Sequence, residues 1–242
     1  RSFVVKSVKK FTCRNMIEKN DFFLKEAGVK FLPFVGDNYE NGISFDEEGR
    51  LVLGTAEKPG KKVLIINQCH YCDEDLTDEE MSSFTRDVFE RRFASYTNAN
   101  SNKGNMVFSE KVFFLTLERI MTGQVNEHSN SFWEYIMFYT YVQDIVRQPT
   151  EIAKDTDYSA PFFRLLDLYK PDYVIVLGYH LYEILPIENG YQGNQLDFDG
   201  SETWIYDLDG CKIQVFPINN LSRIYACDSW HWSIVELFKR VE

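Results

Sequence analysis

The side chains best suited to chemistry lie in one polar run, residues 67–75, which contains a C-x-x-C pair made by Cys69 and Cys72. Such a pair can form a redox couple or supply half of a tetrahedral zinc site. The second half of a zinc site is missing, because Cys211 and Cys227 stand sixteen residues apart and form no close pair. We therefore expect small buried thiols beside a functional loop, with no metal, and favour this over a zinc site or a redox pair.

A second polar run, residues 217–223, offers two amides, a hydroxyl group and a guanidinium group. They belong to Asn219, Asn220, Ser222 and Arg223. These groups suit a phosphate or the edge of a base. An equally good interpretation is that they close hydrogen-bonded turns within their own loop.

Closer to the amino terminus, Asn38 and Tyr39 offer an amide and an aromatic ring in a turn-rich segment. The ring can stack on a planar ligand and the amide can bind its edge. The alternative, equally favoured, is that both residues belong to a tight turn with no ligand.

These polar runs need elements that hold them in place, and the first is a short apolar run at residues 63–66. A proline–glycine turn signal precedes it, and the run predicts a strand buried on both faces. After the polar loop, Thr77 and Glu80 have the spacing of a capping box that starts a helix. In an open α/β sheet, ligands bind outside the carboxyl ends of the strands. The loop at residues 67–75 is therefore the first candidate site.

The later part of the chain contains further predicted strands. Residues 173–177 predict a second buried strand, and residues 204–206 and 212–216 flank a turn and predict a hairpin. Residues 129–146 are rich in aromatic side chains, and we expect a buried segment that is helical first and then extended or loop.

Composition limits the class of protein. The 242 residues are 44% hydrophobic and 16% aromatic, which suits a folded chain with a full core. A net charge of −11 argues against tight non-specific binding of nucleic acid. No apolar run approaches the roughly 18 residues of a membrane span, and an odd count of five cysteines favours reduced thiols in the cytoplasm. We predict one α/β domain over residues 1–242, with a helical extension at residues 1–30 and no membrane partner.

Several motifs occur in an order that is typical of one protein family. They are PFVGDNY at residues 33–39, IINQCHY at 65–71, FYTYVQ at 138–143, PDYVIVLG at 171–178, and the loop at 217–223. In this combination the chain resembles the uracil-DNA glycosylase superfamily, and especially its bacterial members. The resemblance implies a three-layer α/β/α sandwich around a short, mostly parallel central sheet.

The resemblance also implies an activity in DNA repair. Members of this family flip a damaged base, such as uracil, out of DNA and hydrolyse the bond between base and sugar, with no cofactor. By this likeness Gln68 and Asp73 would position the water, and Asn219 would stabilise the departing base. Two positions depart from the family pattern, because Cys69 replaces the catalytic Asp and Pro217 replaces the second-motif His.

The remaining site residues follow from the same likeness. The expected base-binding residues are His70, Tyr71, Thr140 and Asn220. The expected nucleic-acid-binding residues are Asn38, Tyr39, Ser222 and Arg223. The two departures leave open an inactive module that binds a nucleotide, a nucleic acid or a protein, and an unrelated nucleotide-binding α/β protein is a third alternative.

Overall fold

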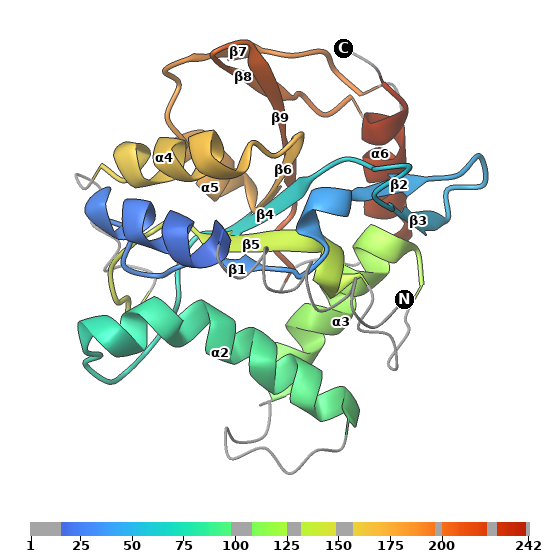
Figure 1. Cartoon of the computed structure of the whole chain (residues 1–242). Coiled ribbons are helices and arrows are strands. Elements are labelled where there is room, and N and C mark those ends of the chain that lie inside the picture. Colours follow the sequence, from blue (N-terminus) through green and yellow to red (C-terminus); the bar gives the residue numbers. More distant parts are fainter. Residues whose placement is uncertain are drawn as a thin grey trace.

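The computed structural model describes residues 16–97, 108–124, 132–148, 157–196, 200–221 and 227–240. A seven-stranded sheet runs through the molecule in the order β1-β5-β4-β6-β9-β8-β7 (Figure 1). Its strands are β1 (Phe34–Val35), β5 (Ile136–Thr140), β4 (Val63–Asn67), β6 (Tyr173–Leu177), β9 (Cys211–Ile218), β8 (Trp204–Leu208) and β7 (Gly190–Gln192). The four strands β5, β4, β6 and β9 are parallel, while β1, β8 and β7 pair antiparallel at the two sides. The predicted α/β class with a parallel centre is confirmed.

Helices and a small hairpin surround this sheet. The hairpin joins β2 (Ile43–Phe45) and β3 (Leu51–Leu53). The α-helices are α2 (Asp78–Thr97), α3 (Phe108–Thr122), α4 (Ser159–Tyr169), α5 (Tyr179–Ile184) and α6 (Cys227–Lys239), and the 3-10 turns are η1 (Tyr39–Asn41) and η2 (Trp133–Tyr135). Residues 16–26 are also helical. None of the helices in the described ranges is both long and apolar enough to cross a bilayer.

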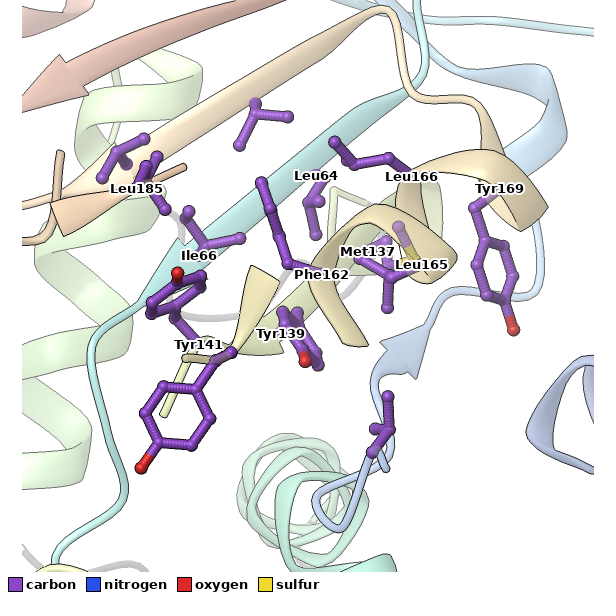
Figure 2. Close-up of a cluster of buried hydrophobic side chains, with 14 of the residues drawn as sticks. Leu64, Ile66, Met137, Tyr139, Tyr141, Phe162, Leu165, Leu166, Tyr169 and Leu185 are labelled. Carbon is purple, nitrogen blue, oxygen red and sulfur yellow. The ribbon is translucent and has the colours of Figure 1, made fainter. Parts of the chain in front are cut away.

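Strand β4 shows why the sheet is buried on both faces. Its residues from Val63 to Ile66 have no exposed surface, and successive side chains point to opposite faces. Leu64 and Ile66 belong to one apolar cluster, shown in Figure 2 with side chains of β5 and α4. Val63 and Ile65 belong to a second cluster, with side chains of α2, α3 and α6. Apolar packing therefore covers both faces of the central strands, as the unbroken apolar run predicted.

The start of α2 agrees with the predicted capping box. The backbone N–H of Glu80 donates to Thr77 Oγ1 at 3.3 Å, and the backbone N–H of Thr77 donates to Glu80 Oε2 at 2.8 Å. The two reciprocal bonds satisfy backbone donors that a helix start leaves without partners. The helix therefore begins directly after the polar loop and limits the length of that loop.

The described part of the aromatic segment has the predicted order, although its helical part is only one short 3-10 turn. The turn η2 leads directly into β5, which pairs with β1 on one side and β4 on the other. All five residues of β5 are buried. A strand enclosed between two neighbours and covered on both faces accepts apolar side chains at every position, so its sequence loses the alternation that marks a half-exposed strand.

The helix at residues 16–26 belongs to the core. Leu24 is fully buried in the same apolar cluster as Leu64 and Ile66, and Asp21 forms a 2.7 Å ion pair with Arg86 of α2. The helix gives way to a turn that ends at Gly28, whose φ of 89° suits glycine. Residues 1–15 of the predicted extension lie outside the described residues.

Candidate functional site

A pocket of about 570 Å³ lies at the carboxyl ends of β4, β6 and β9. It is lined by Asn67, Gln68, Cys69, Tyr71, Ser109, Val112, Phe113, Leu177, Asn220 and Leu221. The first four follow or end β4, Leu177 ends β6, and the last two follow β9. Parallel strands end at the same edge of a sheet, so polar loops far apart in the chain meet there. The structure thus brings Gln68, Tyr71 and Asn220, from the two polar runs, into one pocket.

Helix α3 supplies the wall that the sequence did not indicate. Ser109, Val112 and Phe113 lie near its amino-terminal end and face the strand-end loops across the pocket. Val112 remains 44% exposed, which marks it as part of the rim rather than the core. The position of this helix against the strand ends depends on tertiary packing alone.

Asn67 ends β4 and is held by two hydrogen bonds. Its Oδ1 accepts the Thr140 hydroxyl hydrogen at 2.7 Å, and its Nδ2 donates to the carbonyl oxygen of Cys69 at 3.1 Å. The strands β4 and β5 are in register at these two residues, which explains the contact across 73 positions of the chain. Asn67 opens the candidate loop at residues 67–75, but no individual role was predicted for it, although its place directly after the apolar run was a signal.

His70 lies behind the pocket lining. Its Nε2 is 2.8 Å from Thr140 Oγ1 and 2.9 Å from Thr85 Oγ1. The rings of Phe31 and Phe84 pack against the imidazole, with centroids 5.2 and 4.8 Å away. Burial among these groups lowers the pKa of His70 to about 3. The imidazole is therefore neutral at pH 7 and cannot donate a proton as an imidazolium ion.

Cys69 and Tyr71 interact at the start of the loop. Cys69 is buried, and this burial raises the pKa of its thiol. Tyr71 keeps 55% of its surface exposed, while the buried part of the side chain and the neighbouring Cys69 raise the pKa of its phenol to about 12. Both groups are protonated at pH 7. Cys69 thus supplies neither the carboxylate expected at its position nor a thiolate nucleophile.

Gln68 is the most conspicuous polar group of the pocket. Its Nε2 is buried and has no hydrogen-bond partner within the described part of the chain. A buried donor without a partner costs free energy of the order of 1–3 kcal/mol. A hydrogen-bond acceptor that reaches this nitrogen removes the cost, and Gln68 is one of the residues that line the pocket.

Other predicted residues lie elsewhere. Asp73 and Asn219 are exposed and do not line the pocket. Thr140 is completely buried and reaches the pocket only through Asn67. Ser222 and Arg223 lie outside the described residues.

Asn38 and Tyr39 lie apart from the pocket. Strand β1 runs antiparallel to β5 and leads to the amino-terminal end of that strand, where the backbone N–H of Asn38 donates to the carbonyl of Glu134. Tyr39 is 1% exposed and packs edge-on against Tyr169, which precedes β6. Both residues therefore lie at the opposite edge of the sheet from the pocket, and the ring is enclosed in the core where no base can stack on it.

The described lining contains no charged side chain. Among the described residues, no group of three or more His, Cys, Asp or Glu side chains could hold a metal ion. Comparison of the chain with protein-family models and with curated proteins found no match to either.

Proposed function

We propose that the pocket at the carboxyl ends of β4, β6 and β9 binds a planar heterocyclic base. The observation that carries this proposal is the convergence of three strand-end amides, on Asn67, Gln68 and Asn220, with the ring of Tyr71 in one pocket. Amides match the donors and acceptors at the edge of a base, and aromatic rings stack on its face. A volume of about 570 Å³ lies within the range of small-molecule sites.

Binding without hydrolysis is the activity that this geometry supports best. Hydrolysis of a base–sugar bond uses a carboxylate or another polar group to hold water and stabilise the developing cation, and a donor to receive the departing base. The described lining offers no carboxylate, the thiol of Cys69 is protonated, and His70 lies behind the lining as a neutral imidazole. A free base or nucleoside suits a pocket without charge among its described lining residues better than a DNA duplex does, because duplex binding draws on clustered Lys and Arg.

A DNA-base glycosylase is the second candidate. It is favoured by the buried Gln68 Nε2, which has no partner in the described structure and stands beside Tyr71 as the glycosylase likeness implies. In this alternative Gln68 holds a water molecule that attacks the sugar carbon while the base departs. We also propose the three-layer sandwich of that family. A cytoplasmic location is part of the proposal as well, and it is supported by Cys69, Cys72, Cys211 and Cys227, which form no disulfide bond.

One experiment separates the two candidates. Oligonucleotides that carry uracil, hypoxanthine, xanthine or mismatched thymine are incubated with the protein, and alkali-dependent strand scission is measured beside equilibrium binding of the free bases. We expect base binding and no scission, and we expect Tyr71→Ala to weaken binding about tenfold, which is the value of one lost stacking contact.

The matched control is Tyr191→Ala on β7, because Tyr191 is 43% exposed and does not line the pocket. Scission that Tyr71→Ala abolishes and Tyr191→Ala preserves would identify a glycosylase instead. Absence of both binding and scission in the folded protein would refute both candidates.

A further inference from the structure

Two neighbouring hollows open at the amino-terminal ends of the parallel strands, at the edge of the sheet opposite the pocket. They measure about 360 and 100 Å³ and share Lys61, Asp172 and Phe238 in their walls. Lys61 precedes β4 and Asp172 precedes β6, which places both hollows at this edge. We propose that the two hollows form one binding site for an anion with two linked phosphate groups. This site is separate from the pocket and does not depend on base binding there.

The charge of the lining favours an anion. Four cationic side chains line the two hollows, and they belong to Lys61, Lys212, Lys239 and Arg240. Asp172 supplies the only carboxylate in the described lining. This excess of positive charge occurs in a chain whose net charge is −11, so it is a local feature of the surface. Cations gathered around a concave surface raise the local concentration of anions.

The lysines of this lining are available to a ligand. Asp172 Oδ2 accepts the backbone N–H of Lys62 at 2.7 Å, while its Oδ1 lies 3.3 Å from Lys61 Nζ. The side chains of the Lys61–Asp172 pair are 52% and 36% exposed, and an exposed ion pair of this kind is weak, so Lys61 can turn to a bound anion. Lys212 and Lys239 form no ion pair within the described part of the chain. Three ammonium groups can therefore contact the same ligand.

Gln214 gives independent evidence of a binding site. It is the one polar residue in the apolar run of β9 from Ile213 to Ile218, and it lines the smaller hollow although it is only 9% exposed. Its side-chain amide makes no hydrogen bond to another described residue. Buried polar groups of folded proteins normally have a hydrogen-bond partner. An anion in the smaller hollow supplies an acceptor for the Nε2 hydrogens of Gln214.

Strand β9 and the end of α6 bring these groups together. Side chains two residues apart on a strand point to the same face, so Lys212, Gln214 and Phe216 share one face of the sheet. Phe216 packs in the apolar cluster that includes side chains of α6, and Arg240 follows the last residue of that helix. The guanidinium group of Arg240 is oriented by Glu236, whose Oε1 it contacts at 2.8 Å. The cations of the smaller hollow therefore come from two elements that the core holds in contact.

The sizes of the two hollows suit a pair of phosphate groups. A volume of about 100 Å³ is below the range of sites for drug-sized ligands, but it accommodates a single phosphate group. One phosphate would lie between Lys212, Arg240 and the amide of Gln214. The second would lie in the larger hollow beside Lys239, with Lys61 between the two groups because it lines both hollows.

Isothermal titration calorimetry of the full chain with pyrophosphate and with orthophosphate tests the proposal. Pyrophosphate is expected to bind at least about tenfold more tightly than orthophosphate, because its second phosphate group adds charge-assisted hydrogen bonds in the larger hollow. No binding of pyrophosphate at millimolar concentration, or equal affinities for the two anions, would overturn the proposal. The result does not depend on whether the pocket at the opposite edge binds a base.

Gln214→Leu is the decisive variant, because it removes the buried amide and leaves every charge in place. The affinity for pyrophosphate is expected to fall about tenfold, which corresponds to the loss of one hydrogen bond to a charged group. Lys212→Gln should weaken binding by a similar factor. Lys212 is exposed, so this variant also serves if Gln214→Leu fails to fold.

The matched control is Lys25→Gln, which removes the same charge from an exposed position that lines neither hollow. This variant should bind pyrophosphate as the wild-type protein does. Equal weakening in Lys25→Gln and Lys212→Gln would show that only the overall charge matters, and an unchanged affinity in a folded Gln214→Leu variant would show that the amide has no part in binding. Either result would overturn the proposal. A surface that binds single-stranded oligonucleotides through Lys212 but does not bind pyrophosphate would overturn it as well.

Discussion

At the scale of single residues, environment decides what each reactive side chain can do. A histidine beside a strand end suggests acid–base chemistry, yet His70 is packed by two phenylalanine rings and bonded to two threonine hydroxyls. Cys69 likewise lies in the expected loop but is buried as a neutral thiol. Both residues lose the charged form on which their catalytic use depends.

The burial of His70 predicts a pH-dependent stability. The pKa of His70 is about 3 in the folded protein, against roughly 6.5 in an unfolded chain, so the unfolded state binds more protons between these values. The free energy of unfolding therefore falls as pH drops from 6.5 towards 3, by at most about 1.4 kcal/mol per pH unit from this residue.

Urea denaturation of the wild-type protein and of His70→Gln at pH 7 and pH 4.5 measures the effect. The variant is expected to lose less stability on acidification, because glutamine has no proton to gain. Equal losses in the two proteins would show that His70 is not the group responsible.

At the scale of elements, the pocket depends on how α3 is held against α2. Arg92 of α2 and Glu118 of α3 form a 3.0 Å ion pair whose side chains are 6% and 2% exposed, and Trp133 donates to the same carboxylate at 3.4 Å. Helix α3 is also tied to α6, where a ring nitrogen of His231 lies 2.9 Å from the Ile120 carbonyl oxygen. These contacts hold the helix that supplies one wall of the pocket.

Replacing one residue of the buried Arg92–Glu118 ion pair should lower the stability of the protein far more than replacing both residues. Glu118→Leu leaves the guanidinium group of Arg92 buried without its carboxylate, and we expect a loss of about 3–5 kcal/mol in the free energy of unfolding. The double variant Arg92→Met with Glu118→Leu should recover most of this loss, because apolar side chains can fill the same space.

The chain offers a matched control for this prediction. Arg91 and Glu110 form a second ion pair between α2 and α3, at 2.8 Å, with side chains 24% and 23% exposed. Glu110→Leu should cost no more than about 1 kcal/mol, since the partner charge remains hydrated. If urea denaturation gives similar losses for Glu110→Leu and Glu118→Leu, burial is not what makes the Arg92 pair important.

At the scale of the whole molecule, the two edges of the sheet have different roles. The carboxyl edge carries the pocket, while the amino edge carries the buried Tyr39 and the ion pair of Lys61 with Asp172. The described part of the amino-terminal helix packs into the apolar cluster on one face of the sheet through Leu24 and Ile17, so it folds with the domain and is not an appendage.

This integration predicts a single cooperative unit. Leu24→Ala should lower the free energy of unfolding by about 2–5 kcal/mol, because a fully buried leucine leaves a cavity. Phe22→Ala on the same helix is the control, since Phe22 is 59% exposed and should change stability by no more than about 0.5 kcal/mol. Thermal unfolding followed by circular dichroism and by tryptophan fluorescence should give coincident transitions. Separate transitions would mean that the helix unfolds apart from the sheet.

What the sequence by itself determined is local. The unbroken apolar runs of β4 and β6 identify buried strands, the Thr77 and Glu80 spacing identifies the start of α2, and the polar run after β4 identifies one side of the pocket. These local patterns predicted the observed elements because strand burial and helix capping depend on residues that are neighbours in the chain.

Only the tertiary structure decided which groups share the pocket. It paired Asn67 with Thr140 through the register of two adjacent strands, and it placed α3 across the strand ends. It also placed Tyr39 at the edge of the sheet opposite the pocket, because β1 pairs with β5 in the antiparallel direction. Strand order, direction and register are set by packing between distant segments, and no local pattern of residue types encodes them.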